Sequence, residues 1–216
     1  MFTPGVAGDP MWTPWYYAIG FASWPVIRGL FRLRARGRER LPGGGFVLAA
    51  NHLSNFDPWP LGFPLWPKRR LRWMAKSELF NWILGPMLLH GGAFPVRRGQ
   101  RDRQAVETAV ALARAGDVVV MFPEGTRRTK GLRKKHRAQA HTGAARIAIS
   151  AGVPLVPAAI VGTDRLSRLG PLRVLYGEPV DLSGLEGRDA STAARMATER
   201  LMERIAALED ELRGSR

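Results

Sequence analysis

Short apolar runs alternate with segments of helical periodicity along most of this chain, and this alternation restricts the fold more than any other feature. The runs that we interpret as strands are Phe46–Ala50, Leu71–Ala75, Ala93–Val96, Val118–Phe122, Leu155–Val161 and Leu172–Tyr176. The segments that we interpret as helices are Leu79–Leu89, Arg103–Ala115, Gly143–Ala151 and Ser191–Leu212. Strands that alternate with helices are typical of a layered α/β fold. We therefore predict a central, mostly parallel sheet flanked by helices.

A glycine-rich break, Leu41-Pro42-Gly43-Gly44-Gly45, separates the amino-terminal part from the rest of the chain. Proline and glycine clusters of this kind mark loops between structural units. With 216 residues, of which 45% are hydrophobic, the chain has the length and composition of one domain with a small appendage. We predict an amino-terminal helical segment at residues 1–42 and an α/β domain at residues 43–216.

Aromatic and then basic side chains crowd the amino-terminal segment. The aromatic and apolar residues are Trp12, Trp15, Tyr16, Tyr17, Phe21, Trp24, Ile27, Leu30 and Phe31, and six arginines follow between Arg28 and Arg40. Tryptophan and tyrosine favour the membrane interface, and arginine favours anionic headgroups. We predict that Met11–Arg36 lies in or on one membrane leaflet. The alternative is an aromatic helix that packs on the protein's own core.

The chain is strongly basic and contains no cysteine. Its net charge of +15 comes from 33 Lys and Arg against 18 Asp and Glu, which suits an anionic partner such as a membrane, a polyphosphate or a nucleic acid. Only five of the 33 cations are lysine, so a compositional bias towards arginine explains the excess equally well. The lack of cysteine excludes disulfides, thiolate metal sites and a cysteine nucleophile.

The segment Asn51–Asp57 follows the first predicted strand and carries a histidine and a carboxylate five residues apart. A histidine accepts a proton near neutral pH, so His52 could act as a general base. Asp57 could then orient the imidazole and stabilise its protonated form. The alternative for Asp57 is an ordinary helix N-cap, because Pro58 follows it directly. Ser54 lacks the Gly-x-Ser-x-Gly elbow of a serine nucleophile.

A second motif, Phe122–Arg127, follows the predicted strand at Val118–Phe122 and reads Phe-Pro-Glu-Gly-Thr-Arg. A glycine at a strand end lets backbone N–H groups approach an anion, and Arg127 can bind a phosphate with two hydrogen bonds. Glu124 could orient that arginine or bind a substrate hydroxyl. The alternative is a turn with a surface salt bridge.

Further basic residues follow the strand at Ala93–Val96, where Arg97 and Arg98 are adjacent. The run Lys130–Arg137 is also basic and is best interpreted as a solvated loop, with contact to headgroups or a nucleotide phosphate as the alternative. His90, His136 and His141 have no spacing typical of a metal site, and no Walker loop is present. We therefore predict no metal.

Four motifs in this order resemble the glycerolipid acyltransferases of the lysophosphatidic acid acyltransferase (1-acylglycerol-3-phosphate O-acyltransferase) type. That family shares Asn-His-x4-Asp, Gly-x5-Arg, Phe-Pro-Glu-Gly-Thr-Arg and Val-Pro-x-x-Pro motifs. Here they are Asn51–Asp57, Gly92–Arg98, Phe122–Arg127 and Val153–Pro157. The match spans residues 46 to 163, over half of the chain, and four motifs in order are far more specific than one.

The resemblance implies a reaction and a set of roles. His52 would deprotonate the acceptor hydroxyl of a lysophospholipid, and Asp57 would orient His52. The acyl donor would be a thioester of coenzyme A or acyl carrier protein, with no other cofactor, and the product phosphatidic acid. The acceptor phosphate would be bound by Arg98, Glu124, Gly125, Thr126 and Arg127, with Asn51, Arg97, Pro154 and Pro157 in support. The fold would be the glycerol-phosphate acyltransferase fold, at the cytoplasmic face of the membrane.

Two departures from the family pattern lie where the acceptor or donor would be selected. Arg97 stands where the family often has an acidic residue, and Ala140–Gly143 stands where it often has Phe-Lys-x-Gly. They leave open an acyltransferase for another lysolipid or hydroxyl-bearing lipid. A non-catalytic basic protein that binds an anionic membrane or nucleic acid is a weaker alternative, because it leaves the four motifs unexplained. We predict no nucleic acid partner.

Overall fold

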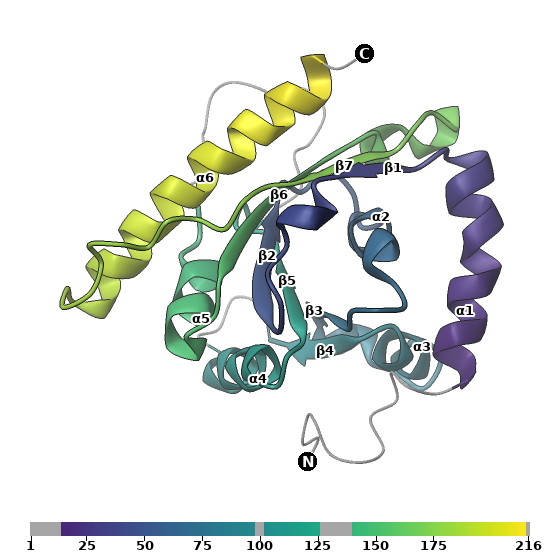
Figure 1. Cartoon of the computed structure of the whole chain (residues 1–216). Coiled ribbons are helices and arrows are strands. Elements are labelled where there is room, and N and C mark those ends of the chain that lie inside the picture. The colour runs from purple at the N-terminus through teal and green to yellow at the C-terminus, as the bar shows by residue number, and fades with distance from the viewer. Residues whose placement is uncertain (1–13, 98–101, 126–139, 215–216) are drawn as a thin grey trace.

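The computed structural model describes residues 14–97, 102–125 and 140–214 and contains a seven-stranded sheet in the order β1-β7-β6-β2-β5-β3-β4 (Figure 1). The strands are β1 (Arg34–Arg36), β2 (Phe46–Ala50), β3 (Leu71–Lys76), β4 (Ala93–Val96), β5 (Val118–Met121), β6 (Leu155–Val161) and β7 (Arg173–Tyr176). Every neighbouring pair is parallel except β6 and β7, which are antiparallel. The predicted α/β class with a mostly parallel sheet is confirmed.

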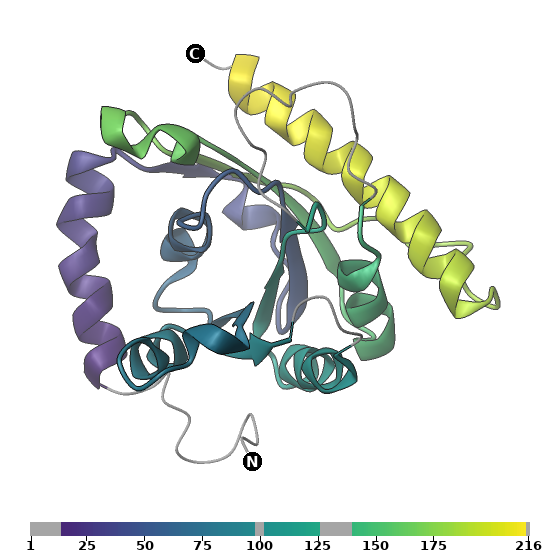
Figure 2. The same ribbon diagram turned by 180° about the vertical axis from the view of Figure 1, so that it is seen from behind.

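Helices cover both faces of the sheet, as Figures 1 and 2 show from opposite sides. The α-helices are α1 (Pro14–Pro25), α2 (Pro58–Gly62), α3 (Leu84–His90), α4 (Arg103–Arg114), α5 (Gly143–Ala151) and α6 (Ala190–Gly214). Alternate residues of β2 serve the two faces: Val47 and Ala49 pack in the core formed with α4, α5 and α6, while Phe46, Leu48 and Ala50 pack in the other core. All five are fully buried, which explains why β2 is a continuous apolar run.

Capping residues begin or end helices α4 and α5 where the sequence predicts. The Asp102 side chain accepts a hydrogen bond from the Ala105 N–H and begins α4, and Gly152 ends α5 at a φ of 67°. The predicted helix at Leu79–Leu89 is wrong in its first half. Asn81 Oδ1 accepts hydrogen bonds from the N–H groups of Ile83 and Leu84, and α3 begins only at Leu84.

The amino-terminal segment combines a buried side with an exposed side. After α1, a π-helical turn (Val26–Leu30) buries Ile27 in the sheet core, and the Phe21 ring packs edge-on at 5.2 Å from Trp66. The exposed apolar side chains of this segment are Ile19, Phe21, Trp24, Val26 and Leu30, so Phe21 stays largely exposed despite its contact with Trp66. No helix within the described ranges is long and apolar enough to cross a membrane.

Strand β1 is an element that the sequence did not predict. Its three residues pair in parallel with β7, so that Arg34, Ala35 and Arg36 lie opposite Arg173, Val174 and Leu175. This strand precedes the glycine break at residues 43–45 and still extends the sheet. The proposed division of the chain after residue 42 stays a prediction.

Candidate active site

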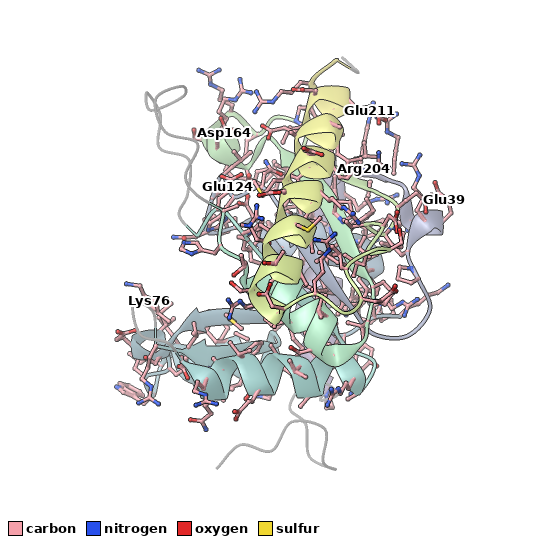
Figure 3. The ribbon with its side chains drawn as sticks, turned by 90° about the vertical axis from the view of Figure 1, so that its left-hand side faces the viewer. Glu39, Lys76, Glu124, Asp164, Arg204 and Glu211 are labelled. Atoms are coloured by element: carbon pink, nitrogen blue, oxygen red, sulfur yellow. The ribbon has the colours of Figure 1, made fainter. Side chains whose placement is uncertain are left out.

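The carboxyl ends of strands β2, β3, β5 and β6 meet at one edge of the sheet, because these strands are mutually parallel. Figure 3 shows three side chains at or just beyond these ends, Lys76, Glu124 and Asp164, on one side of the molecule and Glu39 on the opposite side. Parallel sheets commonly bind ligands beyond the carboxyl ends of their strands. Both lead motifs begin at this edge.

His52 and Asp57 form a dyad at the end of β2. The distance between His52 Nδ1 and Asp57 Oδ2 is 2.8 Å, and the side chains are 12% and 0% exposed. A carboxylate only accepts hydrogen bonds, so His52 holds its proton on Nδ1 and presents the lone pair on Nε2. No described residue makes a hydrogen bond to Nε2. The geometry is that of a general base with an orienting carboxylate.

The Asp57 side chain does not cap helix α2, although Pro58 occupies the first helical position. Its Oδ2 atom instead accepts hydrogen bonds from the backbone N–H groups of Leu53 at 2.6 Å and Ser54 at 2.9 Å. Its Oδ1 atom accepts one from the Thr163 hydroxyl at 2.5 Å. The capping interpretation is wrong for this side chain, because the carboxylate turns back into the loop that carries His52.

Asn51 joins the first motif to β6. Its Nδ2 donates to the Ile160 carbonyl at 3.0 Å, and its Oδ1 accepts from the Ile160 N–H at 2.8 Å. The side chain is fully buried and both amide atoms are satisfied by the backbone. Asn51 therefore attaches the residue before His52 to strand β6, and its supporting role in the site stays a prediction.

The second motif lies against the dyad. The Phe122 ring stacks on the His52 imidazole with 4.3 Å between ring centroids and 20° between planes. Glu124 is buried, at 8% exposure, and Gly125 turns the chain at a φ of 67° with its N–H donating to the Phe122 carbonyl. The structure thus brings Glu124 and Gly125 to the same loop as a ring that contacts His52. Arg98, Thr126, Arg127 and the basic run Lys130–Arg137 lie outside the described residues.

His141, part of a departure from the family pattern, lies against the second motif. A Cβ atom built on Gly125 would come within 2.4 Å of His141 Nε2, and the His141 N–H donates to the Pro123 carbonyl at 2.8 Å. The positive φ at residue 125 favours glycine, and a larger residue there would also displace the exposed His141 ring. The imidazole is exposed at this edge of the sheet.

Arg97, Pro154 and Pro157 lie at three different places in the sheet. Arg97 follows β4, the outermost strand on its side, and its exposed guanidinium lies 3.7 Å from Asp102. The hydrogen bond from the Arg97 N–H to Asp102 is the main cause that lowers the pKa of that carboxyl. Pro154 accepts a hydrogen bond from the Val47 N–H at the opposite end of β2, and Pro157 pairs with Ala49. Pro154 therefore lies away from the dyad, whereas Pro157 lies beside the carboxyl end of β2. The role of these prolines as a wall of the site stays a prediction.

Sequence reasoning missed two residues of this site. Thr163 follows β6 and contacts Asp57, which is 106 residues earlier in the chain, so no local motif contains both. The signal available was position alone, because Thr163 lies two residues beyond a predicted strand. Phe122 lay inside a recognised motif, but its contact with the imidazole becomes visible only when β2 and β5 are paired.

Comparison with known proteins identifies the class of this chain. The family model described as Acyltransferase matches residues 32–161, which is more than half of the chain. The chain therefore belongs to the acyltransferase family, and it is an O-acyltransferase by its similarity to named members over most of its length.

Individual proteins of this family show how far the similarity extends along the chain. The chain is 33% identical over 186 residues to the 1-acyl-sn-glycerol-3-phosphate acyltransferase of Bacillus subtilis (strain 168), covering 83% of this chain and 89% of that protein. It is 29% identical over 182 residues to the enzyme of that name from Haemophilus influenzae, covering 77% and 70%. The crystal structure of the 1-acyl-sn-glycerophosphate (LPA) acyltransferase PlsC from Thermotoga maritima superposes with a TM-score of 0.60, at 23% identity, over 92% of this chain and 85% of that one. That likeness shows a shared fold.

Proposed function

We propose that the protein transfers an acyl chain from a thioester to the free hydroxyl of 1-acylglycerol-3-phosphate and so makes phosphatidic acid. The observation that carries this proposal is the His52–Asp57 dyad at the carboxyl edge of the sheet, 2.8 Å apart and nearly closed to solvent. The names of its relatives support the choice of acceptor, since the Bacillus subtilis relative, matched over 83% of this chain, is a 1-acyl-sn-glycerol-3-phosphate acyltransferase.

The reaction follows from the protonation state of the dyad. The acceptor hydroxyl gives its proton to His52 Nε2 while its oxygen attacks the thioester carbonyl carbon, and Asp57 stabilises the imidazolium that forms. The tetrahedral intermediate then collapses, the C–S bond breaks, and the leaving thiolate takes the proton from His52. An ester and a free thiol result. The protein needs no nucleophile of its own, because the substrate hydroxyl fills that role.

The acceptor phosphate belongs, in this proposal, at the loop after β5. Gly125 is exposed and turns the chain at a positive φ, which lets a ligand approach the backbone of this loop closely, and Glu124 lies buried beside it. Arg98, Thr126 and Arg127 would complete the phosphate site, an assignment that rests on the family motifs. Arg97 and His141 are the described residues in which this edge departs from the family pattern.

The acyl donor is a thioester in either of its common carriers, coenzyme A or acyl carrier protein. Both present the same reacting group, so the dyad does not distinguish them. The basic surface suits either one, because the nucleotide phosphates of coenzyme A and the surface of a typical acyl carrier protein are both anionic. No cofactor takes part in the proposed reaction.

A membrane surface is the third partner in the proposal, at the cytoplasmic face of the cell membrane. The acceptor and the product are lipids, and helices α1 and α3 lie on the side of the molecule away from α6 (Figure 1). Exposed apolar side chains occur in α1 and in or just before α3. Exposed fractions reach 68% at Phe21 and 87% at Trp82. Apolar side chains of this size fit a monotopic contact with one leaflet.

The decisive experiment is acyl transfer by purified protein in liposomes, with lysophosphatidic acid as acceptor and acyl-CoA or acyl-carrier-protein thioester as donor. His52→Ala should lower kcat at least ~10³-fold, because it removes the base. His90→Ala, a histidine in α3, is the matched control and should keep wild-type turnover. A folded His52→Ala protein with undiminished turnover would contradict the assignment of the base.

A second acceptor is favoured by one specific observation, the exposed imidazole of His141 against Gly125 at this edge. The same assay with a panel of lysolipids tests it. A clear preference for lysophosphatidic acid supports the first proposal, and a preference for another lysolipid supports the alternative.

A further inference from the structure

Thr163 makes a contact that neither the family motifs nor the local sequence indicates. Its side chain is 3% exposed, and its hydroxyl donates to Asp57 Oδ1 at 2.5 Å. Within the ranges that the structure describes, it is the only donor to that oxygen. The other three hydrogen bonds to Asp57 converge on Oδ2. Thr163 therefore occupies the position that decides how the carboxylate group is turned.

The orientation of the carboxylate plane matters because His52 forms its hydrogen bond with only one of the two oxygens, Oδ2. A carboxyl group rotates easily about its terminal torsion, which is broad for Asp side chains. Three donors at Oδ2 hold that atom in place but leave Oδ1 free to swing about it. A donor at Oδ1 removes this freedom, since two anchored oxygens define the plane. The lone pair of Oδ2 then points at Nδ1 of His52 throughout the catalytic cycle.

The fold brings Thr163 to Asp57 with little freedom. Asn51 holds Ile160 by two hydrogen bonds, which ties the residue before His52 to the residue three positions before Thr163. Gly162 then leaves β6 at a φ of 103°, where a Cβ atom would lie 2.7 Å from the Pro171 carbonyl oxygen. The turn thus requires glycine and presents the next side chain to the dyad.

We propose that Thr163 is a positioning residue of the catalytic dyad, acting through Asp57 to hold His52 in the orientation that accepts the acceptor's proton. The inference rests on the proposed function of His52 as the base. It assigns Thr163 no contact with substrate. What residue 163 must supply is a hydroxyl that reaches Asp57 Oδ1, because a carboxylate oxygen only accepts hydrogen bonds and needs a donor.

The test is a set of three variants assayed for kcat and KM with lysophosphatidic acid and the donor that supports turnover. Thr163→Val keeps the shape and loses the hydroxyl, and it should lower kcat about tenfold, the size of one hydrogen bond to a charged group, with KM unchanged. Thr163→Ser keeps the hydroxyl and should keep kcat within about twofold of wild type. If Thr163 had only a structural role, its variants would lower the amount of folded enzyme. The kcat per folded molecule would then not differ between Thr163→Val and Thr163→Ser.

Thr198→Val is the matched control, because Thr198 is also buried and its hydroxyl donates to a backbone carbonyl, that of Ala194, within α6. It should lower thermal stability and leave kcat per folded molecule unchanged. If Thr163→Val does not fold, Thr163→Ala serves in its place with the same expected kcat. Wild-type kcat in a folded Thr163→Val or Thr163→Ala protein would overturn the proposal.

A double variant separates action through Asp57 from any other effect. In an Asp57→Asn background, Thr163→Val should lower kcat by less than about twofold, since the carboxylate through which Thr163 acts is gone. A further tenfold loss there would overturn the proposed route. Full activity of His52→Ala would instead refute the base itself, so the two failures give different results.

Discussion

Asp57 stands directly before a proline, which is the pattern of a helix N-cap, and its side chain nevertheless caps no helix. Two backbone N–H groups, His52 and Thr163 all direct hydrogen bonds to its two oxygens. A fully buried carboxylate is tolerated only with such partners. The Asp57-Pro58 pair thus begins helix α2 with its backbone, while the Asp57 side chain contacts His52 in the candidate site.

At the scale of single residues, we predict that Gly162 is needed for both stability and turnover. Gly162→Ala should lower the free energy of unfolding by about 1–3 kcal/mol, because an alanine would adopt an unfavourable positive φ and meet the Pro171 carbonyl. It should also lower kcat, since Thr163 follows it. Thermal unfolding and steady-state kinetics measure both effects.

Gly170→Ala is the control for that prediction, because a Cβ atom there meets no atom within 4 Å and the backbone has no positive φ. It should unfold at nearly the wild-type temperature. Equal melting temperatures for the two alanine variants would contradict the argument from backbone conformation.

Two elements differ from the sequence prediction for the same physical reason. Strand β1 has three residues with two arginines, so it carries no apolar run, and its existence depends on pairing with β7. In place of the first half of the predicted helix at Leu79–Leu89, a 3₁₀ turn ends at Leu79 and a non-helical turn follows, in which Asn81 caps the start of α3. Short elements are decided by their neighbours because their own propensity contributes little.

At the scale of elements, we predict that the protein binds vesicles that contain phosphatidylglycerol through helices α1 and α3. Three consecutive exposed apolar residues, Trp82, Ile83 and Leu84, lie just before and at the start of α3. Ile83→Ser combined with Trp82→Ser should weaken vesicle binding about tenfold or more, because the apolar area that enters the leaflet is lost. Flotation of protein with liposomes on a density gradient measures it.

Ile149→Ser, in α5, is the matched control, since Ile149 is also an exposed isoleucine, at 39%, but lies in the opposite helix layer. It should bind vesicles like wild type. Equal loss in both variants would mean that exposed apolar residues act without regard to position, and α3 would not be the membrane contact.

At the scale of the whole molecule, the sheet places two families of helices on its faces and leaves the carboxyl edge for the site. The central strand β2 lies between β5 and β6, so each motif partner of His52 arrives from a neighbouring strand. Phe122 follows β5, and Thr163 follows β6. The arrangement of the candidate site therefore depends on strand order rather than on any one segment.

The partly buried Tyr16 and the buried Tyr176 make the free energy of unfolding of the whole molecule depend on pH in the alkaline range. Burial raises the pKa of Tyr16 to about 12 and also raises that of Tyr176, whose hydroxyl donates to the Leu61 carbonyl at 2.6 Å. Above pH ~10 the unfolded chain loses protons that the folded protein keeps, so the free energy of unfolding should fall as pH rises. Denaturant unfolding at pH 9 and pH 11 measures this loss.

Tyr176→Phe checks the cause. It should lower stability by about 1 kcal/mol at neutral pH, because the Leu61 carbonyl loses its donor. It should also show a smaller loss than wild type between pH 9 and pH 11, since one titrating phenol is gone. Identical pH dependence in both proteins would show that Tyr176 does not contribute.

The sequence by itself determined the fold class, six of the seven strands, the terminal helix and the dyad of His52 and Asp57. Strand runs such as Phe46–Ala50 are buried on both sides, and their uniform apolar composition records that burial locally. His52 and Asp57 are five residues apart, so one loop holds both. Local pattern is sufficient wherever the partners are close in sequence.

Only the tertiary structure decided which distant residues complete the site. Thr163 meets Asp57 and Phe122 meets His52 because parallel strands bring their carboxyl ends to one edge, whereas His141 and Gly125 both belong to the connection between β5 and α5. It also decided that Pro154 lies at the other end of the sheet. Strand order and register set these distances, and both arise from packing of the whole sheet rather than from the residues at each position.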